Sequence, residues 1–361
     1  MIKYDCLHIF NDPKFSVDYF SFLRSNGVSL DQHQLFHYRC DQRNDQQFGS
    51  MRKTFSRSFF SLWPNLKLLV RMFESKKIIV HGLASPYLLF YLYLFPFLRN
   101  RVFWAMHGKD LYFFRTLKRV RFYHRLYEFF RKKVLREIRV VISDNHEDVK
   151  LLRLWYGSNA KVFASFTYPS NFFRPNQQSA PTKAENPFRI LVGNSADPAN
   201  DHQRAFEILA GFPKQAIKLF APLSYGDPAY RAEVVREGKA RFGESFEPMT
   251  EFLSREEYNR FLTSIDAGLF TNTRQQGMGN IISLLGMGKK VYINPEVSSW
   301  RFFGSLGLTL YSCEEFSLNR CEPEVAAGNR EIVKNYYSEA NLLKQWQEIF
   351  AYQPEVAARE Q

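Results

Sequence analysis

The strongest constraint on the fold is the alternation of short apolar runs with helical stretches along the whole chain. In the first half, strand-like runs lie at residues 4–10, 34–38, 77–80, 101–106 and 140–142. In the second half, they lie at residues 188–192, 217–221, 265–270 and 290–293. Helical patterns separate most of these runs, which is typical of parallel sheets covered by helices on both faces. The sequence therefore predicts an α/β fold with two doubly wound sheets.

A polar stretch with recurring prolines divides the chain. The prolines are Pro169, Pro175, Pro181 and Pro187, and such spacing is typical of interdomain linkers. The length of 361 residues suits two domains, and an apolar share of 45% can fill two cores. We expect an N-terminal domain at 1–168, a linker at 169–187, a C-terminal domain at 188–335, and a helical tail at 336–361 that could pack back on the N-terminal domain.

The charge is unevenly distributed and limits the partners. Residues 1–180 contain 29 Lys and Arg against 13 Asp and Glu, a net of +16, whereas the remainder contains 20 against 23. A basic half suits nucleic acid, an anionic membrane surface or an anionic substrate. The four cysteines, Cys6, Cys40, Cys313 and Cys321, are scattered, as in reduced cytosolic proteins. The first residues show no signal-peptide pattern, so we expect the protein not to be secreted.

Two neighbouring segments bear on membrane binding. Residues 83–98 are uncharged and aromatic, but they are shorter than the roughly 20 residues of a bilayer span and contain Pro86 and Pro96. They fit a buried core helix or a helix whose apolar face enters the lipid interface. Residues 115–139 carry ten Lys and Arg, with apolar residues at 122, 126, 129 and 130 spaced for one helical face. This pattern predicts a basic amphipathic helix that covers either an ordinary core or lipid.

Polar side chains follow the strand-like runs of the first half. His81 comes directly after residues 77–80, and His107-Gly108-Lys109-Asp110 comes directly after residues 101–106. Doubly wound sheets place their sites at such strand ends. His107 could move a proton with Asp110 orienting it, Gly108 would let a substrate approach, and Lys109 would hold an anion. A purely structural role remains the alternative for each histidine. After the next run, we expect Ser143 or Asp144 to cap the following helix.

Two loops of the second half suit phosphate binding. One follows residues 188–192 and begins Gly193-Asn194-Ser195; the other follows residues 265–270 and reads Arg274-Gln275-Gln276-Gly277-Met278-Gly279-Asn280. Glycines before a helix expose backbone N–H groups to a phosphate, and an arginine adds a fixed positive charge. Ordinary turn chemistry is the alternative. Neither a GxxxxGK[ST] phosphate loop nor a strand-linked GxGxxG is present, which counts against an ATPase or a simple dehydrogenase.

Three segments together resemble a known enzyme family. They are residues 191–195 with Asp197, Asn200 and His202, residues 274–279, and residues 107–112 at a strand end. In this order, over roughly residues 75–350, they are similar to the TDP-N-acetylfucosamine:lipid II N-acetylfucosaminyltransferases, glycosyltransferase family 56. The resemblance implies a GT-B fold, in which two Rossmann-like domains face a central cleft, and no cofactor or catalytic metal. It also implies a TDP-sugar donor held by the C-terminal domain and a polyprenyl-diphosphate-linked saccharide acceptor.

The resemblance assigns roles to individual residues. Donor contacts are implied for Gly193, Asn194, Ser195, His202, Pro222, Tyr225, Arg274, Gln275, Gln276, Gly277, Gly279 and Asn280. Arg274 would also stabilise negative charge on the departing TDP. His107 and Asp110 would lie on the acceptor side, together with His81, Gly108 and Lys109. An inverting transfer needs a base such as His107, whereas a retaining transfer could use the donor phosphate instead.

The sequence thus predicts a glycosyltransferase bound peripherally to the cytoplasmic face of a bacterial inner membrane. Its partners would be a nucleotide-sugar donor, a lipid-linked saccharide and an anionic membrane surface, in the synthesis of enterobacterial common antigen, O-antigen or a related polysaccharide. Three alternatives remain open: a UDP- or GDP-sugar donor, a basic protein that binds nucleic acid, and a catalytically silent scaffold. A nucleic-acid-binding protein would leave the loops at 193–202 and 274–280 without a purpose, so we expect no nucleic acid.

Overall fold

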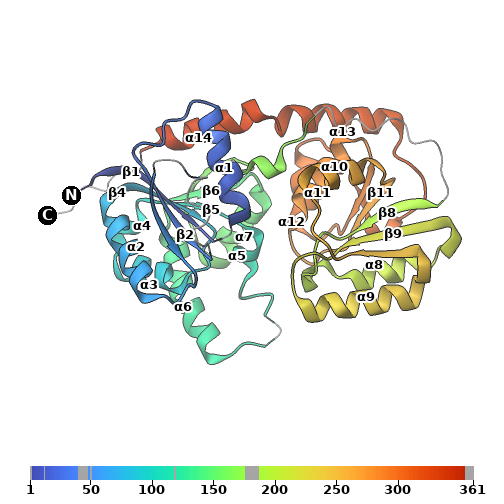
Figure 1. Ribbon diagram of the computed structural model, residues 1–361, viewed down its shortest axis with the longest axis horizontal. Helices are drawn as coiled ribbons and strands as arrows, with labels where there is room; N and C mark the ends of the chain where they lie inside the picture. The colour runs from blue at the N-terminus through green and yellow to red at the C-terminus, as the bar shows by residue number, and fades with distance from the viewer. Residues whose placement is uncertain are drawn as a thin grey trace. The chain divides into compact units, whose positions relative to one another are not determined.

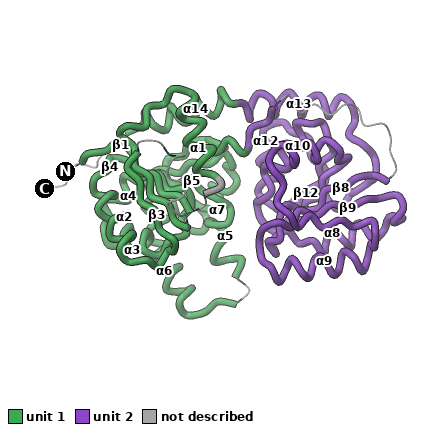
Figure 2. Tube along the Cα trace, viewed as in Figure 1, with its two compact units in different colours: residues 1–170, 339–361 green, residues 171–338 purple. Residues whose placement is uncertain are grey.

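A computed structural model describes residues 2–11, 13–39, 48, 51–117, 119–174 and 187–353 (Figure 1). Most of the linker predicted at 169–187, the end of the predicted tail, and Cys40 lie outside the described residues. The chain divides into two compact units: Met1–Ser170 with Glu339–Gln361, and Asn171–Ser338 (Figure 2). Cys6, Cys313 and Cys321 are free thiols.

The first unit contains a seven-stranded parallel sheet. Its strands are β1 (Tyr4–Phe10), β2 (His33–Tyr38), β3 (Arg52–Ser56), β4 (Ser75–His81), β5 (Val102–Ala105), β6 (Val140–Ile142) and β7 (Lys161–Phe163), in the order β3-β2-β1-β4-β5-β6-β7. The central strands bury both faces, since Leu7 and Ile78 on one face and His8 and Ile79 on the other have no exposed surface. Burial on both faces explains their nearly unbroken apolar sequences.

Helices cover both faces of this sheet. They are α1 (Pro13–Ser25), α2 (Leu62–Glu74), α3 (Pro86–Leu94), α4 (Pro96–Arg99), α5 (Gly108–Tyr112), α6 (Phe122–Glu137), α7 (His146–Tyr156) and α14 (Glu339–Ala351). Figure 1 shows α14 beside α1. Trp346 of α14 packs edge-on against Tyr19 of α1, with ring centroids 4.8 Å apart, and its indole N–H donates to the Thr167 carbonyl at 3.0 Å. The last helix of the chain is therefore part of the core of the first unit.

The second unit repeats the design with six parallel strands. They are β8 (Phe188–Val192), β9 (Ile217–Pro222), β10 (Phe246–Met249), β11 (Ala267–Phe270), β12 (Lys290–Ile293) and β13 (Tyr311–Ser312), in the order β10-β9-β8-β11-β12-β13. Its helices are α8 (His202–Leu209), α9 (Pro228–Phe242), α10 (Arg255–Thr263), α11 (Met278–Gly286), α12 (Ser298–Ser305) and α13 (Pro323–Tyr336). The predicted α/β fold with two doubly wound sheets is confirmed.

The strand orders locate the functional edges. In the first sheet, the chain passes from β1 to β2 and β3 on one side and then returns to β4, on the other side of β1. In the second sheet, it passes from β8 to β9 and β10 and then returns to β11, on the other side of β8. Ligands of doubly wound sheets bind at the carboxyl ends of the strands that flank such a reversal. The loops that follow β8 and β11 contain residues 193–202 and 271–277, the segments that the sequence singled out.

Two predictions about local structure need correction. Ser143 and Asp144 do not cap α7, because the cap is Asn145, whose side-chain oxygen accepts from Glu147 N at 3.1 Å and Asp148 N at 3.3 Å. The core interpretation of α6 also needs correction, because it holds for only part of the helix: Val134 and Leu135 are buried in the core of the first unit, and Phe130 packs against it. The buried face of α6 also carries the ion pair Arg131–Glu128 (2.9 Å), whereas the apolar residues Phe122, Leu126 and Phe129 are exposed. Spacing alone defines an apolar face but not which way it points.

No described helix is long and apolar enough to cross a bilayer. Residues 83–98 form α3 and the start of α4, and the prediction of a buried core element is confirmed. Leu88, Leu89 and Leu92 are buried in the core of the first unit, while Phe90, Leu94 and Phe97 are exposed. The segment is thus a core element with an apolar outer face.

Candidate active site

In the second unit, the loops after β8 and β11 are joined into one structure. The Thr271 hydroxyl donates to the carbonyl of Asp201 at 2.8 Å, and Thr273 N donates to the carbonyl of Ala199 at 2.9 Å. Asn200 ties the first loop together, because its amide donates to Ser195 O at 2.9 Å while its oxygen accepts from Asn194 N at 2.9 Å. The two loops therefore present a preformed surface at the carboxyl edge of the sheet.

Two glycines allow this surface to form. Gly193 and Gly277 have φ of +66° and +71°, which side chains rarely adopt. A Cβ on Gly277 would lie 3.2 Å from the side-chain oxygen of Asn194, so the two loops approach closely there. Gly277 is also the N-cap of α11, and no side chain caps that helix. The first turn of α11 therefore presents backbone N–H groups, the arrangement that binds phosphate at helix N-termini.

Arg274 lies beside this helix terminus and is held by a carboxylate. Its guanidinium donates to Asp197 Oδ2 at 2.8 Å and to the Gln275 carbonyl at 3.1 Å, and the residue is only 7% exposed. These contacts use two of the five N–H donors of an arginine. Asp197 thus orients Arg274. The sequence had singled out Asp197 only as part of the family pattern, and a contact between residues 77 positions apart gives no local signal.

Several polar atoms around this surface are buried without a partner. Among the described residues, these include Asn194 Oδ1, Gln276 Nε2, Asn272 Oδ1 and His202 Nε2. A buried polar group without a hydrogen bond costs about 1–3 kcal/mol, so native proteins contain few of them. Their gathering in two adjoining loops makes this surface the candidate ligand-binding site of the second unit.

The other predicted donor residues fall into two groups. Tyr225, Gly279 and Asn280 lie at the surface formed by the loops: the Asn194 amide donates to the Tyr225 hydroxyl at 3.2 Å, and the side chain of Asn280 hydrogen-bonds the half-buried Tyr258. Ser195, Pro222 and His202 are buried behind it.

His202 supports the loops from below. Its Nδ1 lies 3.2 Å from the Tyr230 hydroxyl, and a Cβ on Gly193 would meet its Nε2 at 2.9 Å. Burial lowers the pKa of His202 to about 4, so the ring is neutral at pH 7. His202 therefore supports the conformation of the loops and adds no charge to the site.

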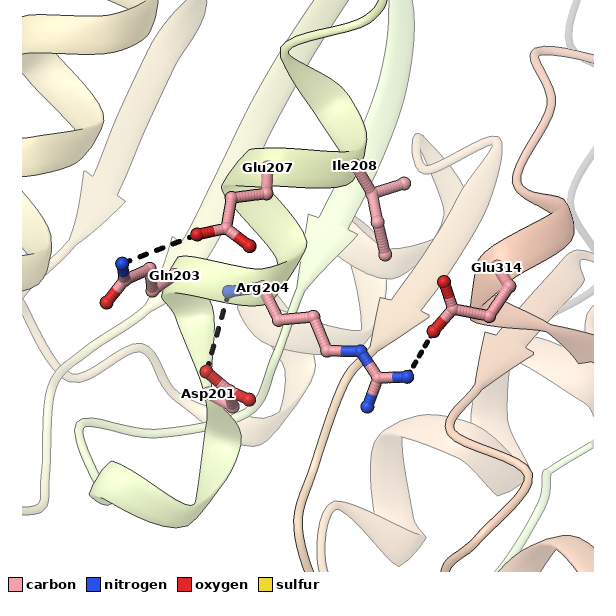
Figure 3. Close-up of a pocket in the computed structure, with 6 residues that line it drawn as sticks. All are labelled: Asp201, Gln203, Arg204, Glu207, Ile208 and Glu314. Carbon is pink, nitrogen blue, oxygen red and sulfur yellow. Dashed lines mark hydrogen bonds and ion pairs between the residues drawn. The ribbon is translucent and has the colours of Figure 1, made fainter.

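A surface depression of about 550 Å³ lies elsewhere on this unit, at the first turns of α8 (Figure 3). It is lined by Asp201, Gln203, Arg204, Glu207, Ile208 and Glu314. Arg204 is engaged by Glu314 across the depression. It contains neither Arg274 nor the unpartnered polar atoms, so we do not regard it as the site.

In the first unit, His107 and its neighbours lie at the end of β5. His107 is half-buried at the start of α5, which contains Gly108, Lys109 and Asp110, and Lys109 is exposed. Among the described residues, Asp110 makes no hydrogen bond to the His107 ring, although Asp110 Oδ2 and His107 Nδ1 would each lie 3.4 Å from a Cβ on Gly82; the carboxylate instead accepts from Leu83 N at 2.9 Å. The ring nitrogen Nε2 instead lies 3.1 Å from the hydroxyl of Tyr168. Tyr168 is a residue that the sequence did not single out, because it lies at the edge of the proline-containing segment.

His81 and Asp144 complete this edge of the sheet. His81 is 2% exposed and belongs to the core, with its Nδ1 2.9 Å from the same Tyr168 hydroxyl. Asp144 follows β6, the strand beside β5, and burial with the nearby Asp148 carboxylate raises its pKa to about 7. His81 ends β4, while His107 and Asp144 follow β5 and β6, so three titratable side chains lie at the carboxyl ends of adjacent strands.

Comparison with known proteins decides the family. The family described as 4-alpha-L-fucosyltransferase, glycosyl transferase group 56, matches residues 22–352. The chain belongs to glycosyltransferase family 56. The match begins well before residue 75, where the predicted resemblance started, so β2, β3 and α2 belong to the same pattern. The protein is therefore a glycosyltransferase.

Solved structures show that the fold is GT-B. Anabaena HepE in complex with UDP and glucose is 14% identical, with a TM-score of 0.67 over 96% of this chain and 99% of that chain. A glycosyltransferase from Rickettsia africae is 13% identical, with a TM-score of 0.61 over 96% and 98%. WaaG, a glycosyltransferase of lipopolysaccharide biosynthesis, is 10% identical, with a TM-score of 0.58 over 97% and 100%.

Proposed function

We propose that this family 56 enzyme transfers a deoxyaminosugar resembling N-acetylfucosamine from a TDP donor to a polyprenyl-diphosphate-linked saccharide. The reaction would take place at the cytoplasmic face of a bacterial inner membrane during surface polysaccharide synthesis. The observation that carries the donor assignment is the group of unpartnered polar atoms beside Arg274 and the uncapped N-terminus of α11. A diphosphate would fill this place, since backbone N–H groups and a guanidinium both favour it.

A UDP-sugar is the second candidate donor. Anabaena HepE, which shares the fold, was solved with UDP. Both nucleotides carry the same diphosphate, so the features around Arg274 serve either. The family resemblance of residues 274–279 favours TDP.

The proposed transfer forms one bond and breaks one. The acceptor hydroxyl oxygen uses an electron pair to bond the anomeric carbon, and the bond from that carbon to the diphosphate oxygen breaks, so TDP leaves with its electron pair. His107 takes the proton of the acceptor hydroxyl. Arg274 and the N–H groups of α11 stabilise the negative charge that develops on TDP, as preorganised donors do in other transferases.

A membrane-facing surface supports a lipid-linked acceptor. In the first unit, α3 packs between α2 and α6, which Figure 1 shows side by side. Large apolar side chains are exposed along these helices and α4: Phe60, Leu62, Trp63, Leu66, Val70, Phe73, Phe90, Leu94, Phe97, Phe122, Tyr123, Leu126 and Phe129. Exposed basic residues accompany them: Lys67, Arg121, Arg125, Lys132, Lys133 and Arg136. Exposed apolar side chains together with exposed cations on the same helices suit an anionic lipid surface.

We predict that replacing Trp63 and Phe122 together by Gln lowers binding to vesicles containing phosphatidylglycerol about tenfold or more. These two side chains are 75% and 81% exposed, so little packing is lost and folding should be retained. Vesicle sedimentation at low and high salt measures the effect. Leu154→Gln is the matched control, since Leu154 is 77% exposed on α7, outside this surface. Equal losses in both variants, or unchanged binding of the double variant, would contradict the membrane-facing surface.

The proposed function is tested by a transfer assay with three donors. The purified enzyme is incubated with the deoxyaminosugar linked to TDP, UDP or GDP and with a polyprenyl-diphosphate-linked saccharide, and mass spectrometry detects the product. We expect product formation with the TDP donor to exceed that with the others. Preference for the UDP donor would instead support the second candidate.

A further inference from the structure

A chain of hydrogen bonds links His107 to three buried histidines of the first unit. The His107 Nε2 lies 3.1 Å from the Tyr168 hydroxyl, which lies 2.9 Å from His81 Nδ1. His81 Nε2 lies 3.3 Å from His8 Nδ1, and His8 Nε2 lies 2.9 Å from His33 Nδ1. His107 is the N-cap of α5, and Tyr168 follows β7. The inner histidines His81, His8 and His33 lie on β4, β1 and β2. We call them the histidine chain.

The inner rings of the histidine chain are enclosed by other aromatic rings. Phe10 stacks on His81 with centroids 3.7 Å apart, and Tyr19 and Trp346 lie edge-on or tilted beside it. Burial, and repulsion from the neighbouring rings, lower the pKa of His8 and His81 well below the usual range. Burial lowers the pKa of His33 to about 4, with Asp5 and Lys77 the charged groups that face it. All three rings are therefore neutral at pH 7.

Neutrality orders the protons along the histidine chain. A neutral imidazole has one N–H donor and one acceptor nitrogen, and a tyrosine hydroxyl has one proton to donate. When every link is satisfied, Tyr168 either accepts a hydrogen bond from His107 or donates one to it, because its oxygen can accept from both neighbouring rings but its single proton goes to only one partner. In the first case, His107 carries its proton on Nε2 and donates to Tyr168, which leaves Nδ1 as the basic nitrogen. In the second, Tyr168 donates to Nε2 and Nδ1 carries the proton, so neither nitrogen can accept one.

We propose that Tyr168 is a positioning residue that, through the histidine chain, holds the proton of His107 on Nε2 and so makes Nδ1 the base of the transfer. This inference rests on the proposed role of His107. Within the described residues, the Nδ1 atom has no protein hydrogen bond. As His107 gains the acceptor proton, its bond to Tyr168 becomes charge-assisted and stronger, and the neutral rings behind Tyr168 polarise with it.

A metal site is the other use that these side chains suggest. Ligand atoms of Cys6, His8 and His33 lie within 4.8 Å of one another. Burial raises the pKa of the Cys6 thiol to about 12, so it is not a thiolate, and the direct His8–His33 hydrogen bond occupies both facing nitrogens. Lys77 adds a positive charge nearby. These features favour the hydrogen-bonded chain over a cation.

The test compares Tyr168→Phe with Tyr19→Phe. The first removes the hydroxyl that links His81 to His107. The second removes a buried hydroxyl that has no partner among the described residues, from a ring that contacts His8, His81 and Tyr168. Nitrogen-15 NMR of the histidine rings at pH 7.5 reports their tautomers without reference to activity. We expect His107 in the Nε2–H form in the wild type and in Tyr19→Phe, and a mixture of tautomers in Tyr168→Phe.

Kinetics complete the test. We expect Tyr168→Phe to lower kcat about tenfold or more with little change in KM, and Tyr19→Phe to leave kcat unchanged, since a wrong tautomer removes a base worth about 10²–10⁴-fold. Identical tautomers in all three proteins would overturn the inference. So would a wild-type kcat in Tyr168→Phe when His107→Gln is inactive. If His107→Gln itself keeps its kcat, the proposed base is wrong, and the inference fails with it while the donor assignment stands.

Discussion

Replacing Arg274 by Ala is expected to lower kcat/KM for the nucleotide sugar about 100-fold or more. Arg274 would lose its contacts to the diphosphate and its stabilisation of the leaving TDP, and single preorganised contacts of this kind are worth about 10²–10³-fold. The substitution also leaves Asp197, which now pairs with Arg274 at 2.8 Å, as an unpaired carboxylate beside the donor. Its repulsion of the diphosphate adds to the loss.

Transfer kinetics and calorimetric titration with TDP measure this effect. Arg204→Ala is the matched control, because Arg204 is also ion-paired in the second unit but lies at the depression of Figure 3. Thermal unfolding of both variants checks that the unit remains folded. Arg274→Lys keeps the charge but not the planar fork, and we expect an intermediate loss. If Arg274→Ala binds TDP as the wild type does, the donor site has been misplaced.

The second large effect is a loss of stability in acid. The pKa values of His33 and His202 fall from an ordinary 6.5 to about 4 on folding, and burial also lowers those of His8 and His81 well below their usual range. Below pH 6.5 the unfolded chain binds protons that the folded chain does not, so the free energy of unfolding decreases as pH falls towards 4. Each shift of about 2.5 pKa units corresponds to about 3 kcal/mol at pH 4.

The two units should differ in how much stability they lose as the pH falls. The first contains three of these neutral histidines and the second contains His202. Urea unfolding between pH 7.5 and 4.5, followed by hydrogen exchange in peptides from β1 and β8, resolves the two units. We expect the first unit to lose more stability. His146→Gln, which replaces an exposed histidine on α7, is the control and should not alter the pH dependence. A flat profile, or a greater loss in the second unit, would contradict the buried neutral histidines.

The sequence predicted the sheets well because buried parallel strands are apolar throughout. The predicted runs at residues 4–10, 188–192 and 290–293 coincide with β1, β8 and β12. It missed β3, whose sequence Arg-Lys-Thr-Phe-Ser is charged and largely unburied, as edge strands are. It also missed β7 and β13, which have only three and two residues.

The site was predictable where the signal is local. The turn at Gly277 and the cation at Arg274 lie in one continuous segment before α11, and the strand order then places them at the reversal of the sheet. Asp197 and Tyr168 were not assigned roles, since each acts on a residue more than 60 positions away. The expected partner of His107, Asp110, proved to bind a backbone N–H instead. Side-chain contacts of this kind require the tertiary structure.

The most direct test of the account is the transfer assay with wild-type enzyme, run on lipid-linked acceptor in anionic vesicles. The account predicts a TDP-dependent product whose mass exceeds that of the acceptor by one deoxyaminosugar residue, with TDP released in equal amount. Release of TDP without an increase in acceptor mass would contradict it, as would transfer that is equally efficient from every nucleotide or to acceptors without the lipid diphosphate.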